Sequence, residues 1–385
     1  MRWFFLLTSL HLYAEISALY LSWYSDPTTT MTIQWHTYSE EIDDRITLYS
    51  QEEPSTLQGT HQWIDDLLVH TLSLENLQPD TEYTFQIGPS PQVYRFRTAP
   101  ASLNRPLRFI VGGDVYEKTK IFRRMSQTAL ESRPDFVVLG GDLAYAIGAY
   151  PLTSQLSRWI SFLHDYKNHM IDKDGRIIPF LIVSGNHDLS PNNYDLFFKL
   201  FAFPEKQLYR TIDFGSYLTL FLLDTGHFQP IEGRQTAWLN HALAERSSVP
   251  YRFAVYHEAA YPSFYPYQAT TPKKIRTYWV PLFEKYGIPV AFEHHNHTFK
   301  RTHPIKAGRI DPTGVVYVGD GAWGVETRNT HDMWYLEKKG KDNHIWLVEL
   351  SLKEATLRAL NLLGEPLDEL TFQMESLQRS PTAHR

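Results

Sequence analysis

The amino-acid sequence predicts two domains, an all-β sandwich followed by a layered α/β domain. The chain has 385 residues, 43% of them hydrophobic, whereas a single hydrophobic core rarely grows beyond about 250–300 residues. Residues 18–100 consist of short runs in which apolar and polar residues alternate, which is the period of a β-strand. From Pro106 onward, strand-like runs alternate with segments of helical periodicity. We therefore place the domain boundary in a linker at residues 99–105.

The start of the chain combines features for and against a secretory signal. A basic second residue and the short apolar run Trp3 to Leu7 fit a signal peptide. His11 and Glu15 do not fit one, and a buried first strand is the alternative. Residues 1–17 are thus a candidate signal peptide, which predicts a secreted or periplasmic protein, with a cytoplasmic one as the alternative. No later apolar run reaches the roughly 20 residues of a membrane helix, so we expect no membrane insertion.

Residues 18–100 are expected to form two packed sheets, because short strands at this spacing are typical of a sandwich. The segment 77–83 adds a corner at which the hydroxyl of Tyr83 can bond to upstream backbone, and in this it resembles a fibronectin type III module. We expect this domain to carry no catalytic chemistry and to pack beside the second one. Its strands are predicted at 19–23, 31–35, 46–49, 68–74, 83–87 and 93–97.

The second domain is predicted to span residues 106–362. Its amphipathic stretches lie between buried strands, which favours helices layered on sheets over a helix bundle. Residues 363–385 are expected to form a C-terminal tail. Strands are predicted at 107–111, 136–139, 177–183, 217–223, 251–256, 288–292, 315–318, 345–352 and 355–360, and helices at 118–132, 154–167, 234–243 and 278–286.

Several buried strands of this domain lead directly into polar residues, most of them through glycine. Such residues lie at the carboxyl edge of a sheet, where open α/β folds bind their ligands. Each feature has an ordinary alternative, since Gly-Asp turns cap strands and histidine-rich stretches occur in surface loops. Five of them after five strands favour one common site. The candidates are Asp114, Asp142 with Tyr145, Asn186 with His187, His257, and His295 with His297.

Composition limits the metals and the partners. The chain has no cysteine, so a metal site must use oxygen and imidazole ligands. This mixture of donors suits two adjacent first-row metals bridged by a carboxylate, and not a tetrahedral structural zinc. A net charge of -6 and the lack of a basic block argue against a nucleic-acid binder. The oligomeric state stays open.

Taken together, these blocks resemble the metal-binding blocks of the purple acid phosphatases, which are calcineurin-like metallophosphoesterases. The resemblance covers about residues 19–350 and is most specific in Gly141-Asp142-Leu-Ala-Tyr145 and Gly185-Asn186-His187-Asp188. It implies a four-layer fold, two β-sheets flanked by helices, after the fibronectin-like domain. It also implies a hydrolase of small phosphate monoesters. A phosphodiesterase or nucleotide hydrolase, and a non-catalytic binding protein, are the alternatives.

The resemblance also implies a role for each residue. A hydroxide activated by two metal ions would attack phosphorus in line. His187 would stabilise the developing charge or protonate the leaving group, and Asp188 would orient the His187 ring. Fe³⁺ would be held by Asp114, Asp142, Tyr145 and His297, and Zn²⁺, Mn²⁺ or Fe²⁺ by the bridging Asp142 with Asn186, His257 and His295.

The chain departs from the family pattern around these ligands. Tyr116 and His294 stand where glycine is expected, and Tyr116 would either crowd the site or add a hydroxyl. Residues 261–267 hold no histidine, whereas plant-type members carry a phosphate-contacting histidine pair after the fourth block. The aromatic residues of this segment would line the mouth of the site or only pack the loop.

Other residues near the ligands leave two interpretations open. His227 and Trp323 follow strand ends and would border the site or lie in the core. The basic residues Lys300, Arg301 and His303 would attract anionic substrates or form a solvated turn.

Overall fold

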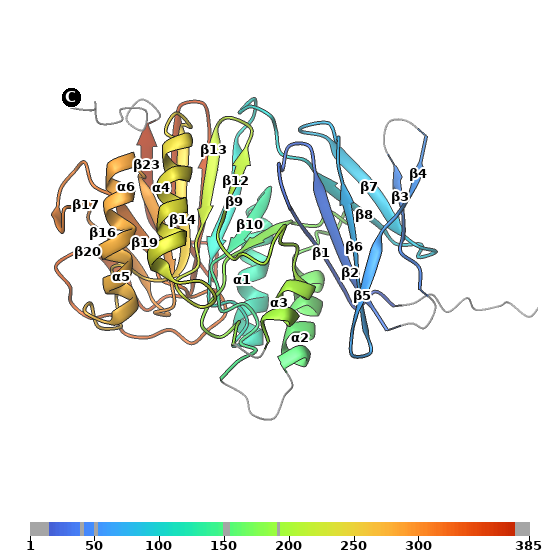
Figure 1. The fold of residues 1–385 in the computed structure, drawn as a ribbon, viewed down its shortest axis with the longest axis horizontal. Coiled ribbons are helices and arrows are strands. Elements are labelled where there is room, and N and C mark those ends of the chain that lie inside the picture. The colour runs from blue at the N-terminus through green and yellow to red at the C-terminus, as the bar shows by residue number, and fades with distance from the viewer. Residues whose placement is uncertain (1–14, 39–41, 50–52, 149–154, 191–192, 374–385) are drawn as a thin grey trace, which may run out of the picture.

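The computed structural model describes residues 15–38, 42–49, 53–148, 155–190 and 193–373. Its first part is an all-β domain of two four-stranded antiparallel sheets (Figure 1), as predicted. The hydroxyl of Tyr83 accepts a hydrogen bond from the backbone N–H of Gln78 at 2.8 Å, which confirms the expected corner. One sheet runs β1 (Ala18–Ser22), β2 (Met31–Thr37), β6 (Leu67–Leu74), β5 (Thr60–Ile64); the other runs β4 (Ser55–Gln58), β3 (Arg45–Tyr49), β7 (Glu82–Ile87), β8 (Val93–Arg97).

The second part contains two large sheets that pack face to face. The six-stranded sheet has the order β11-β10-β9-β21-β22-β23, and the seven-stranded sheet has the order β12-β13-β14-β15-β19-β16-β20. Their strands are β9 (Leu107–Gly112), β10 (Phe136–Leu139), β11 (Phe180–Ile182), β12 (Arg210–Phe214), β13 (Leu218–Leu222), β14 (Tyr251–Glu258), β15 (Val290–His294), β16 (Phe299–Thr302), β19 (Val316–Gly319), β20 (Leu336–Gly340), β21 (His344–Leu350), β22 (Glu354–Asn361) and β23 (Pro366–Gln373).

Helices cover the outer face of each sheet, which confirms the four-layer architecture (Figure 1). Alternate residues of a strand serve the two layers: Phe109 faces the core between the sheets, whereas Ile110 packs with the helices. The helices are α1 (Thr119–Glu131), α2 (Gln155–His169) and α3 (Tyr194–Leu200) beside the first sheet, and η1 (Ile231–Gln235), α4 (Thr236–Glu245), α5 (Thr270–Tyr278) and α6 (Val280–Tyr286) beside the second; β17 (Ile305–Lys306) and β18 (Arg309–Ile310) form a small hairpin.

The two domains share a continuous apolar core. Trp23 of the first domain packs edge-on against Phe136 and Phe214 of the second. The Arg210 guanidinium donates to the Trp23 carbonyl at 2.9 Å, and the Tyr217 hydroxyl donates to the Pro100 carbonyl at 3.0 Å. Buried aromatic contact of this kind fixes the orientation of the domains.

The structure adds strands that the sequence did not predict, and part of the chain lies outside the described residues. Residues 366–373, assigned to the tail, form β23 and pair with β22 along its length. The strands β4 and β5 were not predicted because they are mostly polar and exposed. Most of the candidate signal peptide, residues 1–14, and residues 374–385 lie outside the described residues. Among the helices that are described, none is long and apolar enough to cross a membrane.

Candidate metal centre

The carboxyl ends of strands from both large sheets meet at one place. Asp114 follows β9, Asp142 and Tyr145 follow β10, and Asn186 follows β11, all in the six-stranded sheet. His257 lies near the end of β14, and His295 and His297 follow β15, in the seven-stranded sheet. The structure thus brings together all seven side chains that the sequence singled out as ligands, in two groups.

The first group, which we call the Tyr145 cluster, consists of Asp114, Tyr145 and His297. His297 Nε2 lies 2.9 Å from Asp114 Oδ1 and 3.0 Å from the Tyr145 hydroxyl. The Tyr145 hydroxyl lies 3.3 Å from Asp114 Oδ1. A carboxylate, a phenol and an imidazole therefore converge on one point in the interior.

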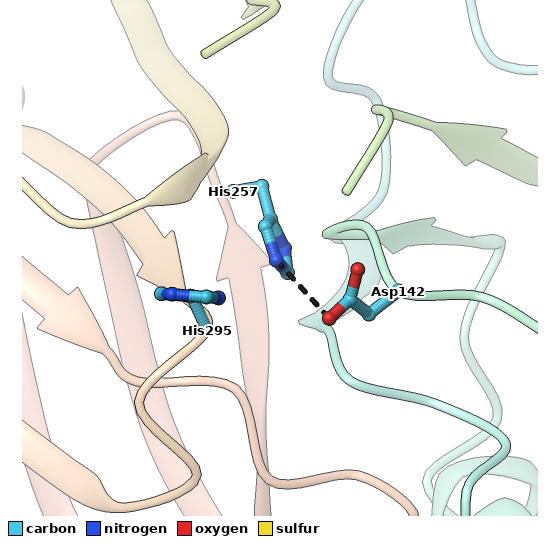
Figure 2. A group of neighbouring side chains, drawn as sticks. All are labelled: Asp142, His257 and His295. Carbon is cyan, nitrogen blue, oxygen red and sulfur yellow. Dashed lines mark ion pairs between the residues drawn. The ribbon is translucent and has the colours of Figure 1, made fainter. Parts of the chain in front are cut away.

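The second group, the His257 cluster, consists of Asp142, Asn186, His257 and His295. Ligand atoms of Asp142, His257 and His295 all lie within 4.8 Å of one another (Figure 2). His257 Nε2 lies 3.4 Å from Asp142 Oδ2 and 3.1 Å from Asn186 Oδ1. The clusters adjoin, because the backbone N–H of His295 donates to Asp114 Oδ2 at 2.8 Å.

The donor atoms fit metal ions. Ligand atoms about 2.0–2.2 Å from a metal and about 90° apart lie roughly 2.8–3.1 Å from each other. Three pairs have this spacing, His297 with Asp114 at 2.9 Å, His297 with Tyr145 at 3.0 Å and His257 with Asn186 at 3.1 Å. Asp142 Oδ2 is buried and has no hydrogen-bond partner among the described residues, although two imidazoles lie near this carboxylate. A buried carboxylate oxygen without a donor is costly unless a cation completes its surroundings. Oxygen and imidazole donors together suit first-row transition metals.

The backbone at the site is held in an unusual conformation. Ten non-glycine residues among those described have positive φ, and five of them are candidate ligands. Such conformations cost free energy and persist where the surrounding structure enforces them, typically at functional sites. The five are Asp114 (φ 57°), Asp142 (50°), Tyr145 (51°), His295 (77°) and His297 (58°).

Two glycines leave room for the carboxylates. A Cβ on Gly185 would lie 2.2 Å from Asp142 Oδ1, and a Cβ on Gly321 would lie 1.7 Å from Asp114 Oδ2. Neither distance is compatible with a side chain. Residue 185 must therefore be glycine, because any side chain there would collide with Asp142.

Burial and charge oppose each other at the buried Asp142–His257 pair. Burial alone would raise the pKa of Asp142, but the His257 imidazole lowers it well below its usual value. Burial lowers the pKa of His257, yet Asp142 raises it to about 10. The carboxylate therefore attracts a positive charge at this point, which a metal ion can supply.

His187 borders the Tyr145 cluster, and its ring is held by a partner that the sequence did not indicate. The ring stacks on Tyr145 with centroids 4.9 Å apart. His187 Nδ1 lies 2.7 Å from the Ile147 carbonyl, so it carries the proton and leaves Nε2 available. The expected orienting role of Asp188 is wrong, because its carboxylate accepts instead from the backbone N–H groups of Leu143 and Gly185, both at 2.8 Å.

Asp188 therefore joins the loops after β10 and β11. Its burial and the nearby Asp142 carboxylate raise the pKa of Asp188 to about 8, against the effect of the two N–H donors. We regard Asp188 as a positioning residue for these loops.

Several other candidates lie away from the ligand atoms. The Tyr116 hydroxyl donates to Asp165 at 2.7 Å, and Trp323 Nε1 donates to Ser126 inside the core. Lys300 is fully buried and pairs with Glu293 at 2.6 Å, and Arg301 pairs with Asp368 at 2.6 Å. These two cations hold the fold together and are not free to attract substrate.

One histidine and one aromatic residue lie directly beside the ligands of the His257 cluster. The His227 ring lies 5.8 Å from that of His257, and burial lowers the pKa of His227 to about 3. Tyr265 stacks on His295 with ring centroids 4.7 Å apart, whereas Tyr261 is buried among Tyr317 and Tyr335. The aromatic loop thus fits both interpretations from the sequence, since Tyr265 borders the site and Tyr261 packs the loop. Arg328, which no motif indicated, donates to the Tyr265 hydroxyl.

Solved structures share this architecture. A purple acid phosphatase, PPD1, from yellow lupin seeds has a TM-score of 0.77 and 15% identity, with 93% of this chain and 75% of that chain covered. At this identity the match shows the fold alone.

Curated relatives carry the same family name. Purple acid phosphatase 21 of Arabidopsis thaliana is 26% identical over 66% of this chain, and purple acid phosphatase 15 of the same plant is 24% identical over 81%. The chain spans 58% of the length of the first and 67% of the second.

Two family models match the two domains. Residues 16–98 match the purple acid phosphatase N-terminal domain, and residues 107–299 match the calcineurin-like phosphoesterase. The second match covers half of the chain and includes all seven residues of the two clusters. The chain belongs to the purple acid phosphatase family of calcineurin-like phosphoesterases.

Proposed function

We propose that this chain is a binuclear metal-dependent hydrolase of small phosphate monoesters. The observation that carries the proposal is the pair of adjoining clusters, in which seven oxygen and nitrogen donors converge at the ends of two sheets. Two neighbouring cations would activate a water as the nucleophile and neutralise the phosphate oxygens during in-line displacement.

The donor sets assign the cations. The Tyr145 cluster offers a phenol beside a carboxylate, which favours Fe³⁺, a hard trivalent ion. The His257 cluster offers an amide and two imidazoles, which favour Zn²⁺, Mn²⁺ or Fe²⁺. Asp142 would bridge the two ions, since its buried Oδ2 has no hydrogen-bond partner in the part of the chain that the structure describes.

His187 would supply the proton chemistry. Because Nδ1–H is bound to the Ile147 carbonyl, Nε2 is the remaining ring nitrogen, and in the imidazolium form its N–H can donate to the leaving oxygen or to the developing charge. Because the backbone holds the ring, it is already oriented before substrate binds.

Two alternatives remain outcomes of the test. One relative, 24% identical over 63% of this chain, is named probable inactive purple acid phosphatase 1. A non-catalytic binding protein is therefore one alternative. All seven donor positions are retained here, which favours the enzyme. A phosphodiesterase or nucleotide hydrolase would use the same ligands, and Tyr145 favours the purple acid type.

Metal content and hydrolysis test the proposal together. We expect about two metal equivalents per chain, one of them iron, and hydrolysis of p-nitrophenyl phosphate in clear preference to bis(p-nitrophenyl) phosphate. Chelation should abolish activity, and resupply of iron with zinc or manganese should restore it. Preference for the diester would favour a phosphodiesterase. Two bound metals without hydrolysis of either ester would favour the binding protein.

A further inference from the structure

A positively charged residue on an aromatic surface borders the His257 cluster. We call Phe264, Tyr265 and Arg328 the Arg328 platform. The Arg328 guanidinium lies over both rings, with its Cζ 5.1 Å from the Phe264 centroid and 5.4 Å from that of Tyr265. Its Nη1 donates to the Tyr265 hydroxyl at 2.9 Å. Two rings and a hydrogen bond restrain the guanidinium, although Arg328 is partly exposed.

The platform is attached to the ligands at two points. The Tyr265 ring stacks on His295, with an interplanar angle of 21° and centroids 4.7 Å apart. The backbone N–H of Arg328 donates to the His297 carbonyl at 2.8 Å. The guanidinium is thus connected to His295, a candidate ligand of the second metal, through the Tyr265 ring and its hydroxyl.

Buried polar groups hold the aromatic loop in this position. Asn296 Oδ1 accepts from the backbone N–H groups of Phe264 at 3.0 Å and Tyr265 at 2.9 Å. Asn296 Nδ2 in turn donates to Asp320 Oδ1 at 3.1 Å. Asn296 lies between the ligands His295 and His297, so the loop and the ligands share one support.

Arg328 carries a charge that no ion pair among the described residues neutralises. Within the part of the chain that the structure describes, no carboxylate lies within salt-bridge distance of its guanidinium, in contrast to Lys300 and Arg301. Five N–H groups form the guanidinium donor set, and Tyr265 takes one of them. The remaining donors suit the oxygens of a phosphate or carboxylate.

We propose that Arg328 binds a second anionic group of the substrate, so that the site prefers phosphate esters and anhydrides whose leaving group carries a further anionic group. The inference rests on the proposed function: the phosphoryl group to be transferred lies at the two clusters, and the leaving group extends over Tyr265. A diphosphate is the simplest such substrate. Tyr265 is then a positioning residue, which holds the guanidinium at a fixed distance from His295.

Substrate comparison tests the inference. We expect Arg328→Ala to lower kcat/KM for ADP about 10-fold more than for p-nitrophenyl phosphate, mainly through KM, because only the first leaving group meets the guanidinium. Arg328→Lys should recover part of the difference, since an ammonium lacks the planar fork. Tyr265→Phe should keep the ring stacked on His295 but give a smaller loss of the same kind.

A matched control and a binding readout separate the outcomes. Arg309→Ala removes the same charge from the exposed β17–β18 hairpin and should leave the substrate ratio unchanged. Competition between methylenediphosphonate, a diphosphate analogue that cannot be hydrolysed, and phosphate, measured by titration calorimetry on the metal-loaded protein, needs no turnover; Arg328→Ala should weaken binding of the diphosphonate selectively. Equal effects on both ligands, or none, overturn the inference even if monoesters are hydrolysed. Absence of all hydrolysis refutes the proposed function instead, and the calorimetry still decides about Arg328.

Discussion

The two clusters of the metal centre are built from the same sheets but differ in their donors. Each takes side chains from both sheets, so neither can form unless the sheets are packed together. The Tyr145 cluster combines a carboxylate with a phenol, and burial followed by the Asp114 charge raises the pKa of the Tyr145 hydroxyl well above its usual value. The His257 cluster has a carboxylate among neutral donors. A cation held by the first cluster would have to displace the proton of a phenol, whereas one held by the second cluster would not.

The largest expected effect comes from Asp142, the residue of the His257 cluster that we propose as the bridge between the two metals. Asp142→Asn removes the negative charge and places either an amide NH₂ group or an uncharged oxygen at the buried position of Oδ2. Both metals should therefore be lost, and hydrolysis should fall to background. Elemental analysis measures the metals. Asp195→Asn, the same change on exposed α3, is the control and should bind metals normally. Retained activity in Asp142→Asn would refute the bridging role.

A pair of variants distinguishes the two clusters. Tyr145→Phe removes the phenol oxygen and keeps the ring that stacks on His187, so iron should be lost while the divalent metal is largely retained. Asn186→Ala is the mirror variant and should weaken the divalent metal by about 10-fold or more with iron retained. Metal titration of both proteins measures this. If both variants lost the same metal, the division into two clusters would be incorrect.

His187 belongs to neither cluster, so its removal should affect turnover and not metal binding. His187→Ala should keep both metals and lower kcat by about 10²-fold, because a positioned proton donor contributes roughly 10²–10⁴-fold. The decrease should be smaller with an activated leaving group such as p-nitrophenolate than with an alkyl alcohol, which needs protonation more. Loss of a metal equivalent in this variant would make His187 a ligand.

The sequence predicted the site better than its surroundings, for a physical reason. Asp114, Asp142 and Asn186 follow strands and glycines that are local in sequence, so their convergence follows from the fold class. Lys300 pairs with Glu293 of β15 and Asp320, and Arg301 pairs with Asp368 of β23, so these ion pairs join different strands and have no local signature. The Ile147 carbonyl that holds His187 has none either, since any residue carries that group. Arg328 lies in a segment without regular structure, where periodicity gives no information.

The smallest expected effect concerns an imidazole beside the clusters that is not a ligand. His294 is fully buried, and neither of its ring nitrogens has a hydrogen-bond partner among the described residues. Its ring fills the space over Gly113 and Gly140, where an added Cβ would lie 2.7 Å and 1.9 Å from it.

His294→Leu keeps a similar volume and removes two unsatisfied polar atoms, so the free energy of unfolding should change by less than about 1.5 kcal/mol. Both metals should be retained. Denaturant unfolding and elemental analysis measure the two quantities, and His294→Gly, which leaves a cavity, should be the less stable protein. Loss of one metal in His294→Leu would place this imidazole within the His257 cluster, and the donor sets compared above would need to be redrawn.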